Sequence, residues 1–159
     1  MPDLSAWGKS IANGYPLSAL LGNERCRQTM PKVYVTGSYW FAAVPMAASI
    51  AVLEEIANSG YLEHTIRMGE LLREGLAQQA AAHGIPIRQS GPVQMPQILF
   101  ADDPAYEKSF AWGEYCIRHG IYFHPWHNMF LSAAHSEADI LRTLEVTDRA
   151  FKTLAAKAC

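Results

Sequence analysis

Cysteine is scarce in this chain of 159 residues, and it contains no run of basic residues and no apolar run as long as a membrane span. The three cysteines, Cys26, Cys116 and Cys159, are an odd number, lie far apart and form no C-x-x-C pair. This argues against a disulfide framework or a zinc site, and we expect free thiols. Because the net charge is -2 and no Lys/Arg run occurs, neither nucleic acid nor an anionic membrane is expected as the main partner.

Signals for membrane insertion or export are also lacking. No apolar stretch is long enough to span a bilayer, and Met1 is followed by Pro2 and Asp3, where a signal peptide would need basic and then apolar residues. We therefore expect a cytoplasmic protein with no membrane partner. Half of the residues are hydrophobic and 18% are charged, which predicts a globular chain with one sizeable core.

The most informative residue that is present is Lys9, which stands between glycines and a proline. Gly8 lets the backbone bend, and Gly14 with Pro16 makes a second turn, so the ammonium group is expected on a tight loop after a short, buried strand. A lysine held in this way can be partly desolvated, which lowers its pKa and frees the amine for a Schiff base with an aldehyde. An ordinary surface lysine in a glycine-rich turn is the alternative interpretation.

The segment around Lys9 resembles the cofactor-lysine segment of class III aminotransferases, the group that includes glutamate-1-semialdehyde aminomutase. The resemblance rests on two runs, Pro2-Asp3-Leu4 and Gly8-Lys9-Ser10-Ile11-Ala12-Asn13-Gly14-Tyr15-Pro16-Leu17-Ser18-Ala19. It implies that Lys9 is the catalytic residue that carries pyridoxal 5'-phosphate (PLP) as a Schiff base. It also implies an α/β fold: the C-terminal part of a fold type I PLP-dependent transferase large domain, followed by a small α+β domain.

Family members are much longer, and their lysine lies past the middle of the chain, so this sequence resembles the C-terminal part of such an enzyme. We expect residues 1–60 to end the PLP-binding large domain and residues 61–159 to form the small domain. The phosphate loop, the aromatic residue that stacks on the cofactor and the aspartate that pairs with the pyridine nitrogen all precede the lysine in the family. The fragment alone is therefore expected to be inactive.

Two hydroxyl residues, Thr36 and Ser38, flank Gly37 ahead of an Ala-rich helix. A helix start presents free N–H groups to an anion, so this turn predicts a phosphate cradle, with an ordinary capping turn as the alternative. In the resembled family a hydroxyl residue at this turn reaches the cofactor phosphate of the neighbouring subunit, which implies a homodimer. Ser38 fits the register better, and Thr36 is the second choice.

Apolar periodicity and turn residues predict the remaining elements. Strands are expected at 16–22, 85–89, 94–101, 120–123 and 129–133. Helices are expected at 23–30, 41–59, 61–83, 104–119 and 137–157. The apolar periodicity of the helices at 61–83 and 137–157 predicts these core residues: Leu62, Ile66, Leu71, Leu72, Leu76, Ile140, Leu144, Phe151 and Leu154. The last helix has a start that resembles a capping box, with Ser136 at the cap and Asp139 three residues later.

Three histidines lie close together in sequence, at His124, His127 and His135. No helix holds two of them four residues apart and no cysteine or carboxylate completes a ligand set, so no metal site is predicted. This segment also resembles the small-domain segment that borders the substrate entrance in aminomutase-like enzymes. His124 and His127 are therefore interpreted as packing or substrate-side residues.

Two classes of function follow. In the first, the chain belongs to a PLP-dependent aminotransferase, which takes a small-molecule amino donor and a carbonyl acceptor, or to an aminomutase, an isomerase, if both are one molecule. In the second, it is a non-catalytic remnant that serves as a structural or partner-binding domain. The substrate is not predicted, because no arginine stands in an evident carboxylate-binding context.

Overall fold

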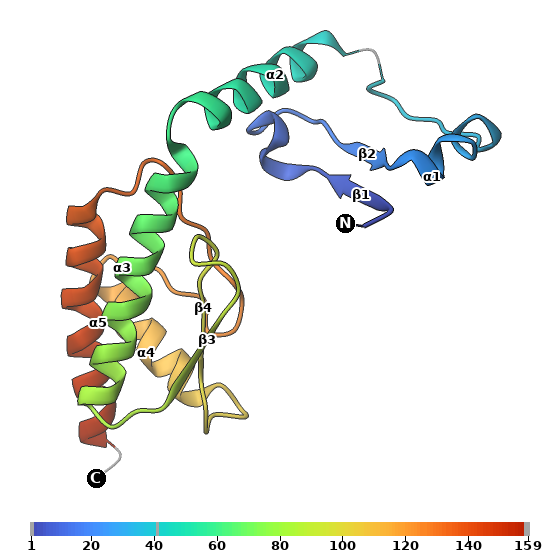
Figure 1. Ribbon diagram of the computed structural model, residues 1–159. Coiled ribbons are helices and arrows are strands. Elements are labelled where there is room, and N and C mark those ends of the chain that lie inside the picture. Colours follow the sequence, from blue (N-terminus) through green and yellow to red (C-terminus); the bar gives the residue numbers. More distant parts are fainter. Residues whose placement is uncertain (1, 41, 158–159) are drawn as a thin grey trace. The chain divides into compact units, whose positions relative to one another are not determined.

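The computed structural model describes residues 2–40 and 42–157, and the chain divides into two compact units (Figure 1). Unit 1 is Met1–Tyr61 and contains the predicted lysine loop. Unit 2 is Leu62–Cys159 and contains the hydrophobic core. Cys159 and Phe41 lie outside the described residues, so the expectation of a free thiol at Cys159 lies outside them too.

Unit 1 begins with a hairpin that frames the lysine loop. Strand β1 (Leu4–Trp7) pairs antiparallel with β2 (Ala19–Gly22), in the register that places Trp7 opposite Ala19. The short helix α1 (Glu24–Arg27) follows, and the side chain of Asn23 caps it by accepting a hydrogen bond from the amide of Arg25. A 3₁₀ turn, η2 (Met30–Lys32), ends this part of the unit.

Helix α2 (Ala43–Asn58) completes unit 1 and supports the lysine loop. The loop contains a 3₁₀ turn, η1 (Lys9–Ala12), and this turn packs against α2. Ala12 is fully buried, and Pro45 and Ser49 are the buried residues of α2 among those described. A small residue on η1 thus allows the turn to lie close to the helix.

Unit 2 is an α+β arrangement of three helices and one hairpin among the described residues. Its elements are α3 (Tyr61–Ala82), β3 (Ile87–Ser90), β4 (Gln97–Phe100), α4 (Glu107–Arg118) and α5 (Glu137–Lys157). The strands are antiparallel, with Ile87 opposite Phe100. The predicted capping box of α5 is confirmed: Asp139 accepts from the Ser136 amide at 2.9 Å, and the Asp139 amide donates to Ser136 Oγ at 3.2 Å.

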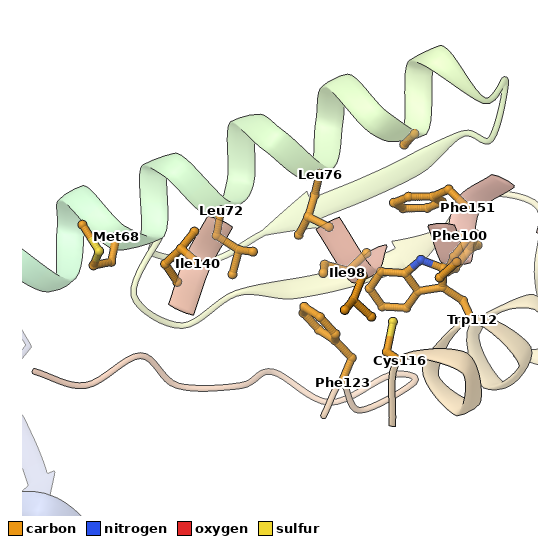
Figure 2. Close-up of a cluster of buried hydrophobic side chains, with 13 residues drawn as sticks. Met68, Leu72, Leu76, Ile98, Phe100, Trp112, Cys116, Phe123, Ile140 and Phe151 are labelled. Carbon is orange, nitrogen blue, oxygen red and sulfur yellow. The ribbon is translucent and has the colours of Figure 1, made fainter. Parts of the chain in front are cut away.

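Trp112 is the centre of the core of unit 2. Its ring lies 4.7 Å from that of Phe123, 5.3 Å from that of Phe151 and 6.0 Å from that of Phe100, centroid to centroid (Figure 2). Leucines of α3 and apolar residues of β4 and α5 surround this aromatic group. These predicted core positions are buried because the 3.6-residue period of α3 and α5 directs them to one face: Leu72, Leu76, Ile140 and Phe151.

Several sequence predictions for strands and burial are wrong. Residues 120–123 and 129–133 form no strand. Gly120 and Ile121 instead end α4, their amides donating to the carbonyls of Ile117 and Cys116. The amides of Met129 and Leu131 donate to the carbonyls of Pro96 and Gln94. In unit 1, β1 and β2 are exposed where buried strands were expected, and in unit 2 Leu62, a predicted core residue, is exposed.

Among the helices that the structure describes, none combines the length and the apolar character needed to cross a bilayer.

Candidate functional site

The lysine loop, residues 8–14, holds its backbone in a fixed path between β1 and β2. Lys9 has φ of 55°, in the left-handed region, and Asn13 has φ of 44°. Successive backbone hydrogen bonds close the turn: the amides of Ile11, Asn13 and Tyr15 donate to the carbonyls of Gly8, Ser10 and Ala12 at 3.1 to 3.3 Å. A lysine with positive φ costs backbone energy on the order of 1–3 kcal/mol, a strain that concentrates at functional positions.

The side chain of Lys9 is exposed and makes no hydrogen bond or ion pair with any residue in the described ranges. The expectation of a desolvated lysine is therefore not met within unit 1. Lys108, by contrast, forms an ion pair with Asp102. An amine without a carboxylate partner is available to react with a carbonyl group, because no ion pair has to be broken first.

The turn that carries Thr36 and Ser38 is exposed and lines an open hollow of about 360 Å³ with Val35, Tyr39, Trp40 and Ala42. The indole of Trp40 lies directly against Gly37: a Cβ atom built on this glycine would be 2.0 Å from Trp40 Nε1. Neither hydroxyl caps α2, whose N-cap is Ala42 and has no side-chain hydrogen bond. The alternative of an ordinary capping turn is therefore wrong.

Unit 2 contains a second candidate site, a cavity of about 680 Å³ that we call the histidine cavity. Its apolar floor includes Leu72, Phe123 and Ile140, which also belong to the core. Its polar lining includes the three histidines that lie close together in sequence, His124, His127 and His135. Asn128, Asp139 and Arg142 also line the cavity. No group of residues in the described part of the chain has the composition and spacing of a metal site.

Sequence reasoning did not identify Arg142 or Asp139 as lining residues. The signal was present, because Asp139 and Arg142 are three residues apart on α5 and so lie on one face of that helix. The pKa of Asp139 is lowered by hydrogen bonds from the Ser136 hydroxyl and amide, with smaller contributions from the charges of His135 and Arg142. The carboxylate is therefore ionised at neutral pH, and its charge offsets that of Arg142.

Comparison with known proteins confirms the family that the residues around Lys9 indicated. The chain belongs to the class-III aminotransferase family, whose family model matches residues 1–135. It is 54% identical over 153 residues to the aminopentol aminotransferase of Sphingopyxis macrogoltabida, covering 96% of this chain and 36% of that protein. It is 31% identical over 166 residues to glutamate-1-semialdehyde 2,1-aminomutase 2 of Brevibacillus brevis, covering 95% and 39%.

Solved structures confirm the predicted fold class. The PLP internal aldimine form of the FumI protein of Sphingopyxis sp. MTA144 matches with a TM-score of 0.92 and 53% identity, over 98% of this chain and 38% of that chain. A transaminase with PLP bound shares the fold at 20% identity, with a TM-score of 0.85. The chain spans less than two-fifths of the length of these relatives, in agreement with the predicted correspondence to part of a longer enzyme.

Proposed function

We propose that this chain is the lysine-bearing part of a PLP-dependent aminotransferase, with Lys9 as the residue that binds the cofactor. Three observations support the proposal: membership of the class-III family, the 53% identity to a protein solved in its PLP internal aldimine form, and an unpaired lysine on a rigid turn. The last of these carries the assignment to Lys9, because it is the lysine with a positive φ, 55°, among the described residues, and these residues give its amine no partner.

The residues present in unit 1 fit this cofactor. An exposed primary amine on a turn that cannot rearrange freely suits a covalent bond to an aldehyde, and exposed hydroxyls suit a phosphate. When bound, PLP supplies an aldehyde carbon and an electron sink. Lys9 Nζ would hold the cofactor and, as a free amine, would accept and return the α-proton of the amino substrate.

The role proposed for Ser38, with Thr36 as second choice, is to donate a hydrogen bond to the cofactor phosphate. Both hydroxyls are exposed, and neither has a hydrogen-bond partner among residues 2–40 and 42–157. In the family this contact crosses to the neighbouring subunit, so the proposal includes a homodimer. It also includes the assignment of residues 1–60 to the cofactor-binding domain and 61–159 to the small domain, and a cytoplasmic location.

The proposed substrates are an amine that bears hydroxyl groups, as donor, and a carbonyl compound, as acceptor. The relative with 54% identity is named for aminopentol, whereas the aminomutase of Brevibacillus brevis shares only 31%. Identity at this level favours aminotransfer over aminomutation. An aminomutase would interconvert its substrate without a separate acceptor, so dependence of the rate on added carbonyl acceptor distinguishes the two.

Borohydride reduction in the presence of PLP, followed by peptide mapping, tests the assignment of Lys9. We expect the label on the Lys9 peptide in the protein that contains this chain. The variant Lys9→Arg should lose the label, because a guanidinium does not form the Schiff base, while the control Lys32→Arg, in another exposed turn, should keep it. Label on any other lysine of this chain, with Lys9 untouched, would overturn the proposal.

A further inference from the structure

The three histidines of the histidine cavity have their tautomers fixed by the backbone around them. His124 Nδ1 accepts hydrogen bonds from two amides, those of Trp126 at 3.3 Å and His127 at 3.0 Å. His135 Nδ1 accepts from the amide of Ser132 at 3.0 Å. An atom that accepts from an amide carries no proton, so the neutral rings of His124 and His135 carry theirs on Nε2.

His127 has the opposite tautomer. Its Nδ1 lies 2.7 Å from the carbonyl oxygen of Asn128, which only accepts, so Nδ1 is protonated and Nε2 of the neutral ring is an acceptor. None of the three Nε2 atoms has a hydrogen-bond partner in the part of the chain that the structure describes. The three histidines that line the cavity therefore carry two donors and one acceptor that no described residue uses.

The ring of His124 is held rigidly, as a residue that recognises a ligand should be. Trp126 packs edge-on against it, with ring centroids 4.7 Å apart, and Trp126 is itself held between Tyr106 and Phe110 at 5.4 Å each. Two amide hydrogen bonds and the ring contacts with Trp126 and His127 thus fix the direction of the Nε2–H bond. A donor fixed in advance loses little conformational entropy when it binds a partner.

The charges in the histidine cavity select against a simple anion. Arg142 has no ion-pair partner within 4 Å among the described residues, and its guanidinium lies beside Gly120. The carboxylate of Asp139 lines the same cavity and offsets its positive charge. The lining carries one acidic and one basic side chain and mixes hydrogen-bond donors with acceptors, which matches hydroxyl groups, since each hydroxyl both donates and accepts.

We propose that the histidine cavity of unit 2 binds a polyhydroxylated ligand, with His124 and His135 donating from Nε2 and His127 accepting. A volume of about 680 Å³ is in the range of small-molecule sites, and an apolar floor with a few convergent polar groups is their usual composition. The ligand class is argued from this cavity alone. Its identification with the hydroxyl-bearing part of an amine substrate rests on the proposed function.

The test is a titration of the 159-residue chain, with ¹⁵N-labelled histidine, by sorbitol, followed through the imidazole nitrogens in NMR spectra. The spectra should show protonated Nε2 in His124 and His135 and protonated Nδ1 in His127. Sorbitol should shift the Nε2 signals of these three rings and saturate in the millimolar range. His119, whose Nδ1 bonds to the Tyr115 carbonyl outside the cavity, is the internal control and should not shift.

Two substitutions of His124 separate ligand binding from support of the loop. His124→Asn keeps an oxygen that can accept from the two amides but removes the Nε2 donor, so sorbitol affinity should fall about three- to tenfold, the usual effect of one hydrogen bond. His124→Gln keeps a donor near Nε2 but loses the acceptor that supports the loop. Unchanged sorbitol affinity in His124→Asn would overturn the proposal, whether or not the Gln variant folds.

A carboxylate probe decides between a polyol and an anion. Propionate should bind more weakly than sorbitol, and tighter propionate binding that is lost in Arg142→Gln would show an anion site and overturn the proposal. The titration uses neither PLP nor turnover. Sorbitol binding without a label on Lys9 would therefore support the cavity assignment and contradict the proposed function. A label on Lys9 without sorbitol binding would support the proposed function and overturn the cavity assignment.

Discussion

Helix α3 contains two glycines, Gly69 and Gly75, that together test how tightly this helix is packed. A Cβ atom on Gly69 would lie 2.4 Å from the carbonyl oxygen of Val93 and 2.6 Å from its carbonyl carbon. A Cβ atom on Gly75 would lie 2.5 and 2.6 Å from the two methyl groups of Leu144. The backbone at Val93 can withdraw only if the loop before β4 moves, whereas the half-buried leucine side chain can change its rotamer.

The expected magnitudes follow from two opposing terms. Alanine stabilises a helix interior by about 1 kcal/mol relative to glycine. Overpacking against an immovable group costs about 1–3 kcal/mol, and the backbone overlap at Gly69 places this substitution at the upper end. Gly69→Ala should therefore lower the free energy of unfolding by about 2 kcal/mol, which for a domain of 60–100 residues lowers Tm by about 8–16 °C. For Gly75→Ala the two terms nearly cancel.

Thermal unfolding of the full chain, followed by near-UV circular dichroism, measures the effect, because Trp112 and its aromatic neighbours lie in the core that α3 covers. The two variants have the same change in composition and in helix propensity, so each controls for the other. Equal Tm values for Gly69→Ala and Gly75→Ala, or a Gly69→Ala variant as stable as the parent, would refute the reasoning.

Four further predictions concern reactivity, pH, association and activity. Burial raises the pKa of the Cys116 thiol to about 12, so a thiol reagent should modify Cys26 in the native chain and Cys116 only after unfolding, as mapped by mass spectrometry. The hydrogen bonds from Ser136 lower the pKa of Asp139. The ionised Asp139 carboxylate therefore stabilises the folded state above the ordinary carboxyl pKa, and this stabilisation is lost as the pH falls through the lowered pKa. Asp139→Asn should therefore lower Tm near neutral pH and leave it unchanged near pH 2, and an equal decrease at both would contradict this. Because α2 exposes Ile50 and Leu53, the chain should self-associate, as measured by sedimentation, and the substitutions Ile50→Gln and Leu53→Gln should weaken this association. A parent chain that stays monomeric at high concentration would contradict the prediction. With PLP added, the 159-residue chain should catalyse transamination of a simple amine on the order of thousands-fold more slowly than an ordinary aminotransferase. The reason is that no carboxylate here is assigned to the pyridine nitrogen of the cofactor. An ordinary enzymatic rate would contradict this prediction.

The helices of unit 2 could be predicted because their signals are local. The apolar period and the capping box set α5 at Glu137–Lys157, as expected, and α3 ends one residue before the predicted end. The strands expected at 120–123 and 129–133 did not form, since an apolar run becomes a strand only if a partner edge is available. Met129 and Leu131 bond to the loop before β4, and that pairing is invisible in the run itself.

The histidine cavity shows a similar limit. The spacing of His124, His127 and His135 indicated that they could converge, and the structure places all three in one lining. Their tautomers depend on the amides of Trp126 and Ser132, which no spacing rule reveals. The opposite charges of Asp139 and Arg142 are brought to the cavity by helix α5, so the ligand chemistry followed only from the three-dimensional arrangement.

The lysine loop depends on its surroundings in a different way. Glycines and a proline sufficed to predict a tight turn at Lys9, but desolvation of the amine requires atoms from elsewhere, and in unit 1 the side chain is exposed. Helix α2, which supports this turn, is apolar on nearly all sides, yet only Pro45 and Ser49 are buried among its described residues. A helix of that composition is typical of a protein interior. Covering a single exposed aliphatic side chain such as Ile50 contributes about 1.5–3 kcal/mol, so the surface of α2 strongly favours a partner surface. Because η1 packs on α2, a surface that covers the helix around the turn would also exclude water near Lys9. If Lys9 has the cofactor-binding role proposed above, its amine would acquire its reactivity from the same burial that stabilises the helix.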